Sequence, residues 1–547
     1  MSPVSEAMPR LERDHAHEPE GSTHDRDPWW TQAVGYQVYL RSFNDHDGDG
    51  IGDLLGLTNR LDHIARLGVD YLWITPFYPS PHADHGYDVS DHTDVDPIFG
   101  RLEDVDAVVE RAHALGLRVV IDVVPNHTSN QHPWFQDALT GRDATFRDHY
   151  VWRDPAPDGG RPNNWVSKFG GPAWSWHAPS GQYYLHTFLP QQPDLNWSNP
   201  AVHRAFEDVL RFWMARGVDG FRIDTAHLLT KDPCYRDNPR LHQVPDNADA
   251  ETVYYSFDHR HDLDQADVVE IYRRWRQITR SSGALLLGEV GLFEAELVGR
   301  YVADGVLDLA FYFPTLKVGW DAASIRKVLA EGLDHGAQRL AWPLSSHDDP
   351  RATQRFGGGR HGADRALAYL TLLSGLPGNT FILQGDELGL DGSQLPLESQ
   401  VDPVATRGGG AFGRDASRTP MPWSNDPNFG FTTGEPWLPF PSDLDVEHTA
   451  AWQESTPDSP LARTRRLLTI RKQLPDLLGA APVTWLDAAD DVVAYRRGQT
   501  VVATNLAASP RPRPDGRELI ERYRSTPTPN DNGHDIPADT TVLLTPR

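Results

Sequence analysis

The sequence predicts an α/β protein built on a (β/α)8 barrel, with a subdomain inserted after the third strand and a C-terminal β-sandwich. Three observations support this fold class: eight short apolar runs typical of strands, helix-like segments between them, and a change to short strands alone near the C-terminus. The strand-like runs span residues 35–43, 71–78, 118–125, 220–226, 284–290, 307–313, 340–345 and 379–383. Strands that alternate with helices indicate a parallel sheet, and eight is the number that closes such a sheet into a TIM barrel.

Helix-like segments separate several of these runs, at residues 54–67, 102–115, 201–216 and 268–279. Two intervals interrupt the alternation. Residues 128–196 are rich in Trp, Pro, Gly and Asn and are too long for a bare loop, so they predict a subdomain over the barrel mouth. The Gly/Pro-rich interval 389–439 follows the eighth strand and is expected at the same end of the barrel.

The two ends of the chain differ from the barrel region. Residues 1–27 are polar and charged, which is typical of a disordered tail. After a helix-like run at 462–473, short strands at 492–497, 499–505 and 540–545 predict the C-terminal sandwich. The predicted organisation is a tail over 1–27, a barrel over 28–127 and 197–465, an inserted subdomain over 128–196 and a β domain over 466–547.

Composition limits the partners and the location of the protein. The chain has 51 Lys and Arg residues against 77 Asp and Glu, a net charge of −26, which disfavours nucleic acid and anionic membranes but is compatible with neutral ligands. No apolar run reaches transmembrane length, and the N-terminus lacks the apolar core of a signal peptide. Cys234 is the only cysteine, which excludes an intrachain disulfide. These features predict a soluble cytoplasmic protein and leave its oligomeric state open.

Four of the predicted strands end in side chains that can do chemistry. His127, Asp224 and Glu289 follow strands three, four and five, and the pair His347 and Asp348 follows strand seven. Because the carboxyl ends of barrel strands share one face, we expect these five residues to meet at one mouth. A single polar strand end more often caps a helix or faces water. Three acids and two histidines on four strand ends together favour an active site.

Carboxylates around a neutral ligand indicate glycoside hydrolysis. Asp224 lies two residues after Arg222, on the same side of its strand, so the guanidinium should lower its pKa and keep it an ionised nucleophile. Glu289 follows an apolar run, which should raise its pKa and suit it to acid/base catalysis. Asp348, beside His347, is placed to bind sugar hydroxyls and to stabilise positive charge in the transition state.

Several motifs around these strand ends occur in a characteristic order. They are ADHGYD, DVVPNH, QPDLNW, GFRIDTA, GEV, SSHDD, QGDELG and GRDASRTPMPW, between about residues 29 and 440. As a set they resemble the motif regions of the α-amylase superfamily, glycoside hydrolase family 13, and more narrowly its α-glucosidase and oligo-1,6-glucosidase branch. The later segments VVAYRR and VVATNL are similar to that family's C-terminal domain.

The resemblance implies a retaining double displacement with Asp224 as nucleophile, Glu289 as acid/base and Asp348 as transition-state stabiliser. It also implies that Arg222 orients the nucleophile, with Asp122 as its structural partner. The residues implied to hold the terminal glucose are Asp84, Tyr87, His127, His347 and Arg418, in a pocket walled by Phe169 and Phe188.

Three positions bear on substrate preference. Ser346 and His85 stand where the family usually has Asn, so an amide hydrogen bond behind the site is expected to be missing. In the resembling branch the residue after the nucleophile tracks linkage, Thr with α-1,4 bonds and Val with α-1,6 bonds. Thr225 therefore implies α-1,4 cleavage, although simple packing would also explain it. Two long insertions over the mouth should make a closed pocket, which favours exo attack on a chain end.

An aspartate-rich loop near the N-terminus predicts a metal site. Asp45, Asp47, Asp49 and Asp53 stand at alternate positions around a glycine turn, with Ile51 offering its carbonyl. Position twelve of the loop is glycine rather than Glu, which disfavours an EF-hand. A metal-free turn is the alternative, but four Asp in nine residues would repel one another without a cation. The resembling branch has a similar loop, so we expect a structural Ca²⁺ or Mg²⁺.

Taken together, the residues and the resemblance predict a retaining exo-acting α-glucosidase. It would release terminal α-1,4-linked glucose from short oligosaccharides or small α-glucosides, with a small sugar as its partner and no organic cofactor. A glucosyl-transferring or isomerising enzyme of the sucrose or trehalose isomerase type is the alternative, because it would use the same covalent intermediate while excluding water. A catalytically inactive binding protein on this fold ranks lower, because the chain retains all three acids.

Overall fold

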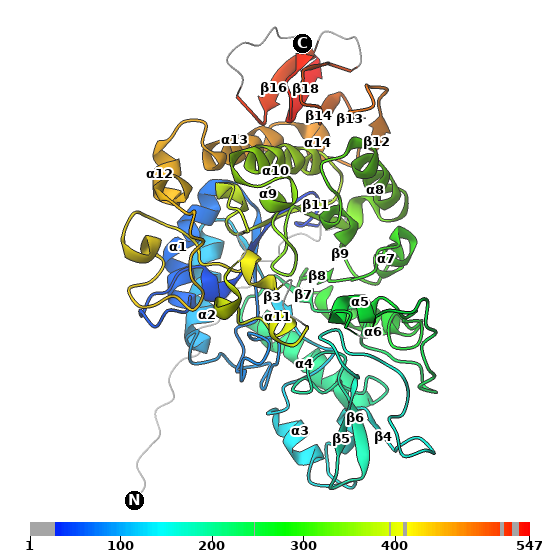
Figure 1. Ribbon diagram of the computed structural model, residues 1–547. Coiled ribbons are helices and arrows are strands. Elements are labelled where there is room, and N and C mark those ends of the chain that lie inside the picture. The colour runs from blue at the N-terminus through cyan, green and yellow to red at the C-terminus, as the bar shows by residue number, and fades with distance from the viewer. Residues whose placement is uncertain are drawn as a thin grey trace, which may run out of the picture.

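A closed barrel of eight parallel strands forms the centre of the molecule, in the order β1-β11-β10-β9-β8-β7-β3-β2 (Figure 1). The computed structural model describes residues 28–245, 247–392, 395–408, 413–514, 519–527 and 535–546 of the chain. The tail predicted over residues 1–27 lies outside the described residues.

The barrel strands confirm the predicted architecture. They are β1 (Val34–Val38), β2 (Tyr71–Ile74), β3 (Arg118–Val123), β7 (Gly220–Ile223), β8 (Leu285–Gly288), β9 (Leu309–Phe311), β10 (Leu340–Pro343) and β11 (Asn379–Leu383). Seven of them lie inside the runs expected from the sequence, and β1 begins one residue earlier. Buried side chains from these strands, among them Trp73, Leu287 and Phe311, pack together inside the barrel.

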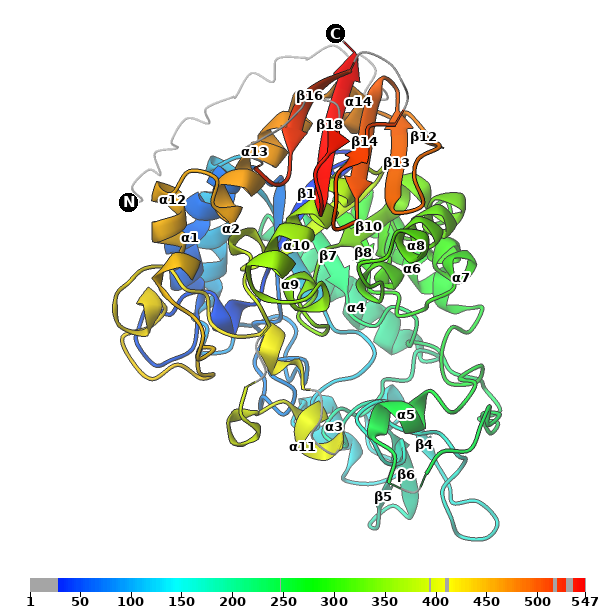
Figure 2. The same cartoon turned by 45° about the horizontal axis from the view of Figure 1, so that its top comes forward.

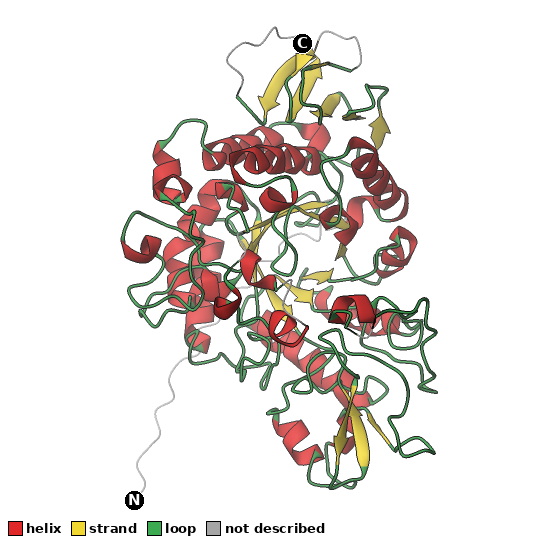
Figure 3. Cartoon of the chain, viewed as in Figure 1, coloured by secondary structure: helices red, strands yellow, loops and turns green. Residues whose placement is uncertain are grey.

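Helices surround the barrel (Figure 3). They are α1 (Leu54–Leu67), α2 (Leu102–Ala114), α4 (Pro200–Ala215), α5 (Ala250–Tyr254), α6 (Val268–Thr279), α7 (Ala295–Tyr301), α8 (Ala322–His335), α9 (Ala352–Arg355) and α10 (Gly359–Ser374). The residues at the two ends of α1 explain where this helix begins and ends. Asp53 accepts a hydrogen bond from the Gly56 N–H at its start, and Gly68, with φ 94°, ends it. None of the helices in the described part of the chain combines the length and apolar character that a membrane crossing needs.

The insertion between β3 and α4 forms a small subdomain, seen below the barrel in Figure 1. It contains α3 (Pro133–Ala138) and a three-stranded antiparallel sheet of β4 (Trp152–Arg153), β6 (Gln182–Leu185) and β5 (Trp174–His177). Trp165 and Trp174 stack in its core with ring centroids 6.1 Å apart. A bridge between His127 and Asp194 joins the end of the insertion to the end of β3. The aromatic-rich segment therefore has a core of its own and is anchored beside the barrel mouth.

The C-terminal region is a pair of antiparallel sheets (Figure 2), which follow α12 (Ala450–Ser455), α13 (Pro460–Lys472) and α14 (Pro475–Leu478) in the chain. The larger sheet has the order β12-β13-β14-β18-β16, and the smaller pairs β15 with β17. Their bounds are β12 (Val483–Trp485), β13 (Val492–Arg497), β14 (Thr500–Asn505), β15 (Arg511–Pro512), β16 (Leu519–Arg524), β17 (Asp535–Ile536) and β18 (Thr540–Pro546). Strands β13, β14 and β18 match the predicted ones, whereas β12 and β16 were not predicted.

Helix α10 lies between the barrel and the C-terminal sheet. The Tyr495 hydroxyl donates to the Leu372 carbonyl at 2.5 Å, and the Thr541 hydroxyl donates to the Ala368 carbonyl at 2.7 Å. Residues 366–374 are all buried as a result. A helix buried on both sides has little polar face, which explains why the amphipathic pattern of α10 is weaker than that of α1 or α4.

Candidate active site

The strand ends converge as the barrel register requires. Strand β7 pairs with β8 so that Ile223 lies beside Gly288. Asp224 and Glu289 are the next residues along the two strands, so they emerge side by side at the carboxyl end of the barrel. Asp348 follows β10 and reaches the same cavity, which has a volume of about 610 Å³.

Most of the predicted catalytic and substrate residues line this cavity. They are Asp84, Tyr87, His127, Phe169, Phe188, Asp224, Thr225, Glu289 and Asp348. The other three predicted residues, Arg222, His347 and Arg418, are buried behind the lining and contact residues within it. The fold therefore brings all twelve together, in two layers.

One buried arginine holds three carboxylates on the first wall of the cavity. Arg222 Nη1 lies 2.5 Å from Asp122 Oδ1 and 2.9 Å from Asp224 Oδ1. Its Nη2 lies 2.5 Å from Glu289 Oε2. The guanidinium also lies over the Trp73 ring, 4.7 Å from the centroid. We call Arg222, Asp122, Asp224 and Glu289 the Arg222 cluster.

Asp224 and Glu289 are neighbours on the two nitrogens of one guanidinium, that of Arg222. Thr225 contacts both: its N–H donates to Glu289 Oε2 at 3.0 Å, and its hydroxyl donates to Asp224 Oδ2 at 3.1 Å. Thr225 has φ 41°, in the left-handed region that a β-branched residue rarely adopts. Arg222 and Thr225 therefore hold the two carboxyl groups side by side at the mouth of the barrel.

Burial raises the pKa of Asp224 to about 6 and the pKa of Glu289 to about 7, although Arg222 opposes both shifts. Asp224 keeps the lower value of the two, as the sequence indicated. The predicted direction for Asp224 is wrong, however, because its pKa lies above its ordinary value. The guanidinium that should lower it is shared with Asp122 and Glu289, and all three carboxylates are removed from water. The pair can therefore hold a proton near neutral pH, as acid/base catalysis requires.

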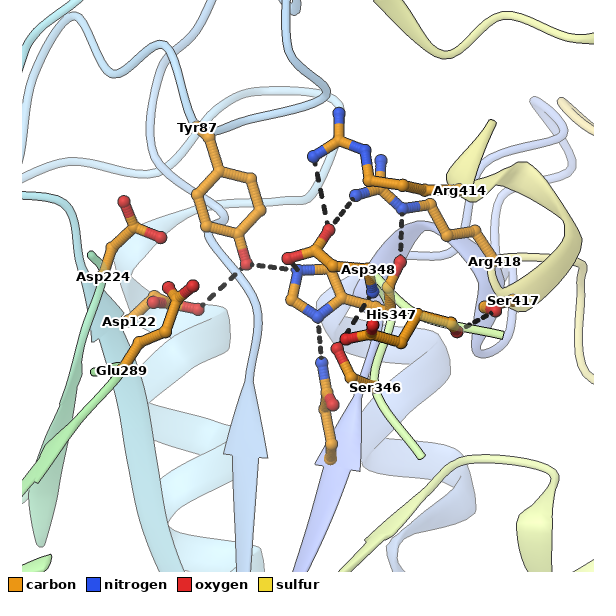
Figure 4. Close-up of polar contacts among 12 residues, drawn as sticks. Tyr87, Asp122, Asp224, Glu289, Ser346, His347, Asp348, Arg414, Ser417 and Arg418 are labelled. Atoms are coloured by element: carbon orange, nitrogen blue, oxygen red, sulfur yellow. Dashed lines mark hydrogen bonds and ion pairs between the residues drawn. The ribbon is translucent and has the colours of Figure 1, made fainter. Parts of the chain in front are cut away.

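Asp348 stands on the facing wall between two arginines (Figure 4). Arg418 Nη2 lies 2.6 Å from Asp348 Oδ1, and Arg414 Nη1 lies 3.3 Å from the same oxygen. Arg414 Nη2 also lies 2.7 Å from both Asp84 Oδ1 and Asp402 Oδ1. Burial alone would raise the pKa of Asp348, but His347, Arg414 and Arg418 together hold it far below its usual value. We call these five residues the Arg414–Arg418 cluster.

Tyr87 and His347 separate the two clusters (Figure 4). The Tyr87 hydroxyl lies 2.8 Å from His347 Nε2 and 3.4 Å from Asp122 Oδ2. Burial lowers the pKa of His347 to about 3, so the imidazole is neutral. The Gln37 amide lies 2.6 Å from His347 Nδ1 and donates to it, which leaves the ring proton on Nε2. His347 therefore donates to Tyr87, and Tyr87 donates to Asp122.

Aromatic rings form a further wall. Phe169 and Phe188 meet edge to face with centroids 5.5 Å apart, and the Arg414 guanidinium lies 5.1 Å from the Phe169 centroid. The His127 ring lies 5.1 Å from Phe188, and its Nε2 lies 3.0 Å from the Tyr87 carbonyl. These contacts hold flat apolar faces against the cavity, which suits the faces of a sugar ring.

Ser346 and His85, the two residues that depart from the family pattern, have different surroundings. The Ser346 hydroxyl accepts a hydrogen bond from the Asp348 N–H at 3.0 Å, so the shorter side chain still supports the backbone of the acid. His85 has φ 50° and its ring lies 5.5 Å from Trp437. Its buried Nε2 has no hydrogen-bond partner among the described residues, and burial lowers the pKa of His85 to about 3.

The unpredicted residues at the cavity include Lys168, Tyr254 and Arg414 in its lining and Asp402, which pairs with Arg414. Arg414 had a usable signal, because it lies four residues before Arg418 in the motif GRDASRTPMPW. The other three lie in the inserted subdomain, in the segment after β11 and in the short helix α5, outside every motif. Only the folded chain brings them to the barrel mouth.

The predicted metal loop places three of its carboxylates together. Asp45, Asp47 and Asp49 each offer an oxygen, and these oxygens lie within 4.8 Å of one another. Burial and the neighbouring carboxylates raise the pKa of Asp49. Asp53 is not one of these three, and its two oxygens accept the N–H groups of Gly56, at the start of α1, and of His46. The Ile51 N–H donates to Asp49 Oδ1 at 2.8 Å.

Known proteins share this architecture. The family described as alpha amylase, catalytic domain, matches residues 37–479. A probable alpha-glucosidase of Rhizobium meliloti (strain 1021) is 44% identical over 468 residues, which cover 83% of this chain and 84% of the relative. An oligo-1,6-glucosidase of Heyndrickxia coagulans is 35% identical over 487 residues, which cover 81% and 85%.

Among solved structures, the crystal structure of an alpha-glucosyl transfer enzyme, XgtA, matches with a TM-score of 0.88 and 38% sequence identity. The match covers 95% of this chain and 100% of that chain. The family match, the relatives and the convergent acids agree. The chain is therefore a glycoside hydrolase of the α-amylase superfamily, family 13, and belongs to its α-glucosidase and oligo-1,6-glucosidase branch.

Proposed function

We propose that this protein is a retaining, exo-acting α-glucosidase that releases terminal α-1,4-linked glucose from short oligosaccharides or small α-glucosides. The observation that carries the proposal is the carboxyl pair of Asp224 and Glu289, which Arg222 holds together in one cavity with the ionised Asp348. A nucleophile and a nearby acid are the two groups that retaining cleavage requires. A fixed anion stabilises the positive charge that develops on the sugar.

In the first step, Asp224 attacks the anomeric carbon while Glu289 protonates the glycosidic oxygen, so the bond to the leaving group breaks and a glucosyl ester forms. In the second step, the ionised Glu289 removes a proton from water, the water oxygen bonds to the anomeric carbon, and Asp224 leaves. Arg222 contacts both acids and fixes their relative positions for both steps. Asp348 needs no proton exchange, because its arginines keep it ionised.

The linkage assignment is supported by Thr225, which follows the nucleophile where the resembling branch has Thr for α-1,4 bonds. The exo assignment is supported by a cavity enclosed by the insertion and by the segment after β11. Initial rates on maltose and isomaltose test the linkage, and faster isomaltose cleavage would overturn it. Release of glucose alone from a maltooligosaccharide is the expected exo product.

Glucosyl transfer is the second candidate, and the likeness to the structure of an alpha-glucosyl transfer enzyme favours it. Both reactions pass through the same ester at Asp224 and differ in whether water or a sugar hydroxyl attacks it. Product analysis over a rising sugar concentration separates them. Hydrolysis predicts glucose as the main product throughout, whereas a transferase accumulates longer or isomeric glucosides.

We propose further that the loop of Asp45, Asp47 and Asp49, with the Ile51 carbonyl and Asp53, holds a structural Ca²⁺ or Mg²⁺. Three carboxylate oxygens that converge within 4.8 Å fit a hard divalent cation. Such an ion would stabilise the loop that leads into α1. Removal of the ion by a chelator should lower the melting temperature, and an unchanged melting temperature with no bound metal would refute the site.

We propose that the protein acts on neutral sugars and has no nucleic-acid or membrane partner. Its net charge of −26 supports this proposal. A cytoplasmic location is supported by the single, exposed Cys234. Cell fractionation with an activity assay tests the location.

A further inference from the structure

One charged residue of the cavity has no task in the mechanism. Lys168 lines the cavity, and in the part of the chain that the structure describes its Nζ makes no hydrogen bond or ion pair. The other cations of the lining are paired, Lys317 with Asp349 at 2.6 Å and Arg414 with its carboxylates. A partly buried ammonium without an acceptor has lost hydrogen bonds that water would provide. It is therefore suited to an acceptor brought by a ligand.

The position of Lys168 is fixed by its surroundings. Its N–H donates to the Thr187 carbonyl at 2.9 Å, and the hydroxyl of the preceding Ser167 donates to the Phe188 carbonyl at 2.7 Å. Its Nζ lies 5.8 Å from the centroid of the Phe188 ring and 5.7 Å from that of the Tyr254 ring. Contacts with two aromatic rings stabilise the ammonium and restrict its movement.

Contacts of helix α5 place Lys168 toward the Glu289 side of the cavity. Its Nζ lies against the Tyr254 ring, and the adjacent Tyr255 ring lies 6.5 Å from the ring of Phe293, four residues after Glu289. Burial lowers the pKa of Lys168, and the carboxylates that oppose this most strongly are Glu289 and Asp224. Glu289 delivers its proton to the oxygen of the leaving group, so the leaving sugar lies on the Glu289 side. The glucose that is cleaved off lies instead toward Tyr87 and the Arg414–Arg418 cluster.

We propose that Lys168 binds the leaving sugar by donating hydrogen bonds to its hydroxyl groups, and that it thereby selects disaccharides and oligosaccharides over glucosides with an aglycone that lacks hydroxyls. The inference rests on the proposed α-glucosidase function and adds a residue that binds the aglycone. A neutral polyol fits better than an anionic aglycone, because Glu251, Asp349 and Asp415 also line the cavity.

The test compares maltose with α-glucosyl fluoride, in which the leaving group is a single atom without hydroxyls. Lys168→Met keeps the length of the side chain and removes its donors. This variant should lower kcat/KM for maltose about ten- to hundred-fold, as expected for lost hydrogen bonds to a charged donor. The value for α-glucosyl fluoride should fall less than about two-fold, because its leaving group accepts no hydrogen bond from Lys168.

Two further variants make the comparison specific. Lys168→Arg retains a cationic donor and should recover most of the maltose activity. Lys317→Met removes a lysine of the same cavity that is already paired, and it should change both substrates by the same factor.

Two results would overturn the inference: equal losses on both substrates, or undiminished maltose cleavage in Lys168→Met. Failure of the proposed function would be visible in the wild-type enzyme instead. If the wild type prefers another glucosyl disaccharide, that sugar replaces maltose and the comparison stands. A wild type that cleaves α-glucosyl fluoride but no disaccharide would overturn both proposals.

Discussion

The two acidic walls of the cavity contain the same kinds of group in different proportions. In the Arg222 cluster one arginine serves three carboxylates, and burial raises the pKa of Asp224 to about 6 and of Glu289 to about 7. In the Arg414–Arg418 cluster two arginines serve three carboxylates, and the pKa of Asp348 lies far below its usual value. Burial is common to both walls, so the difference comes from the neighbouring groups: His347 and two arginines act on Asp348, whereas a single arginine is shared by Asp224 and Glu289.

This difference assigns a task to each wall. A wall that is short of cations binds and releases protons near neutral pH, which suits the exchange between Glu289 and the leaving group. A wall rich in cations holds a permanent negative charge, which suits Asp348 as an electrostatic stabiliser. Tyr87 and His347 lie between the walls and connect them through neutral hydrogen bonds. Two clusters of similar composition therefore do different chemistry within one cavity.

The largest expected effect removes the nucleophile from the proton-exchanging wall. Asp224→Asn should lower kcat by about 10⁴-fold or more, since the amide cannot form the glucosyl ester. Steady-state kinetics on maltose measure the loss, and circular dichroism checks the fold. Glu251→Gln, at an exposed carboxylate of the cavity rim outside both clusters, is the matched control and should retain most activity. Full activity in Asp224→Asn would show that Asp224 is not the nucleophile and would contradict the role assigned to the Arg222 cluster.

A smaller loss is expected on the facing wall. Asp348→Asn should lower kcat by about 10²- to 10³-fold, because it removes fixed charge and leaves the covalent chemistry possible. Loss of this neighbouring anion should also lower the pKa values of Asp224 and Glu289, so both pH limbs should move to lower pH. A pH profile of the variant checks the shift. Limbs that move upward would show that Asp348 does not act on the pair as a negative charge.

Arg222→Met tests the shared cation directly. Three buried carboxylates would lose their only guanidinium, which should cost about 3–5 kcal/mol of stability. The folded-state pKa values of Asp224 and Glu289 would rise further above their unfolded values, so the destabilisation should grow as the pH rises and shrink as the carboxylates protonate. Melting temperatures of variant and wild type at pH 5 and pH 8 measure this. An equal deficit at both values would contradict it.

The smallest effect concerns the backbone of Asp348. Ser346→Ala removes the acceptor of the Asp348 N–H and should cost about 1 kcal/mol, or about five-fold in kcat. Ser346→Asn restores an acceptor and should retain more activity than the alanine variant. If both variants match the wild type, the hydrogen bond does not help to place Asp348.

The barrel could be predicted from the sequence because its signals are local. Each strand is a short apolar run with a polar end, and parallel pairing alone then brings Asp224 and Glu289 together. Strand β16 was not predicted, because residues 519–524 have the sequence LIERYR. They contain no apolar run, and their charged side chains are partly or fully exposed. Helix α10 was not predicted either, since burial against two layers weakens the amphipathic pattern.

The acids of the site could be predicted, but their electrostatics could not. Arg222 and Asp224 are two residues apart, so the sequence shows one cation beside one carboxylate and indicates a lowered pKa. Asp122 and Glu289 join that cation from other strands, which only the folded barrel reveals. Lys168 was not predicted for a similar reason. It lies in the inserted subdomain, and only the folded chain places it at the cavity.

The pH dependence of kcat/KM for maltose tests the contrast between the walls most directly. The wild-type profile should be a narrow bell with apparent pKa values near 6 and near 7, which belong to the coupled pair Asp224 and Glu289. Activity should fall below the first value as Asp224 protonates and above the second as Glu289 loses its proton. An acid limb near pH 4, the ordinary range of an aspartate, would show that Arg222 outweighs burial and would contradict the assignment.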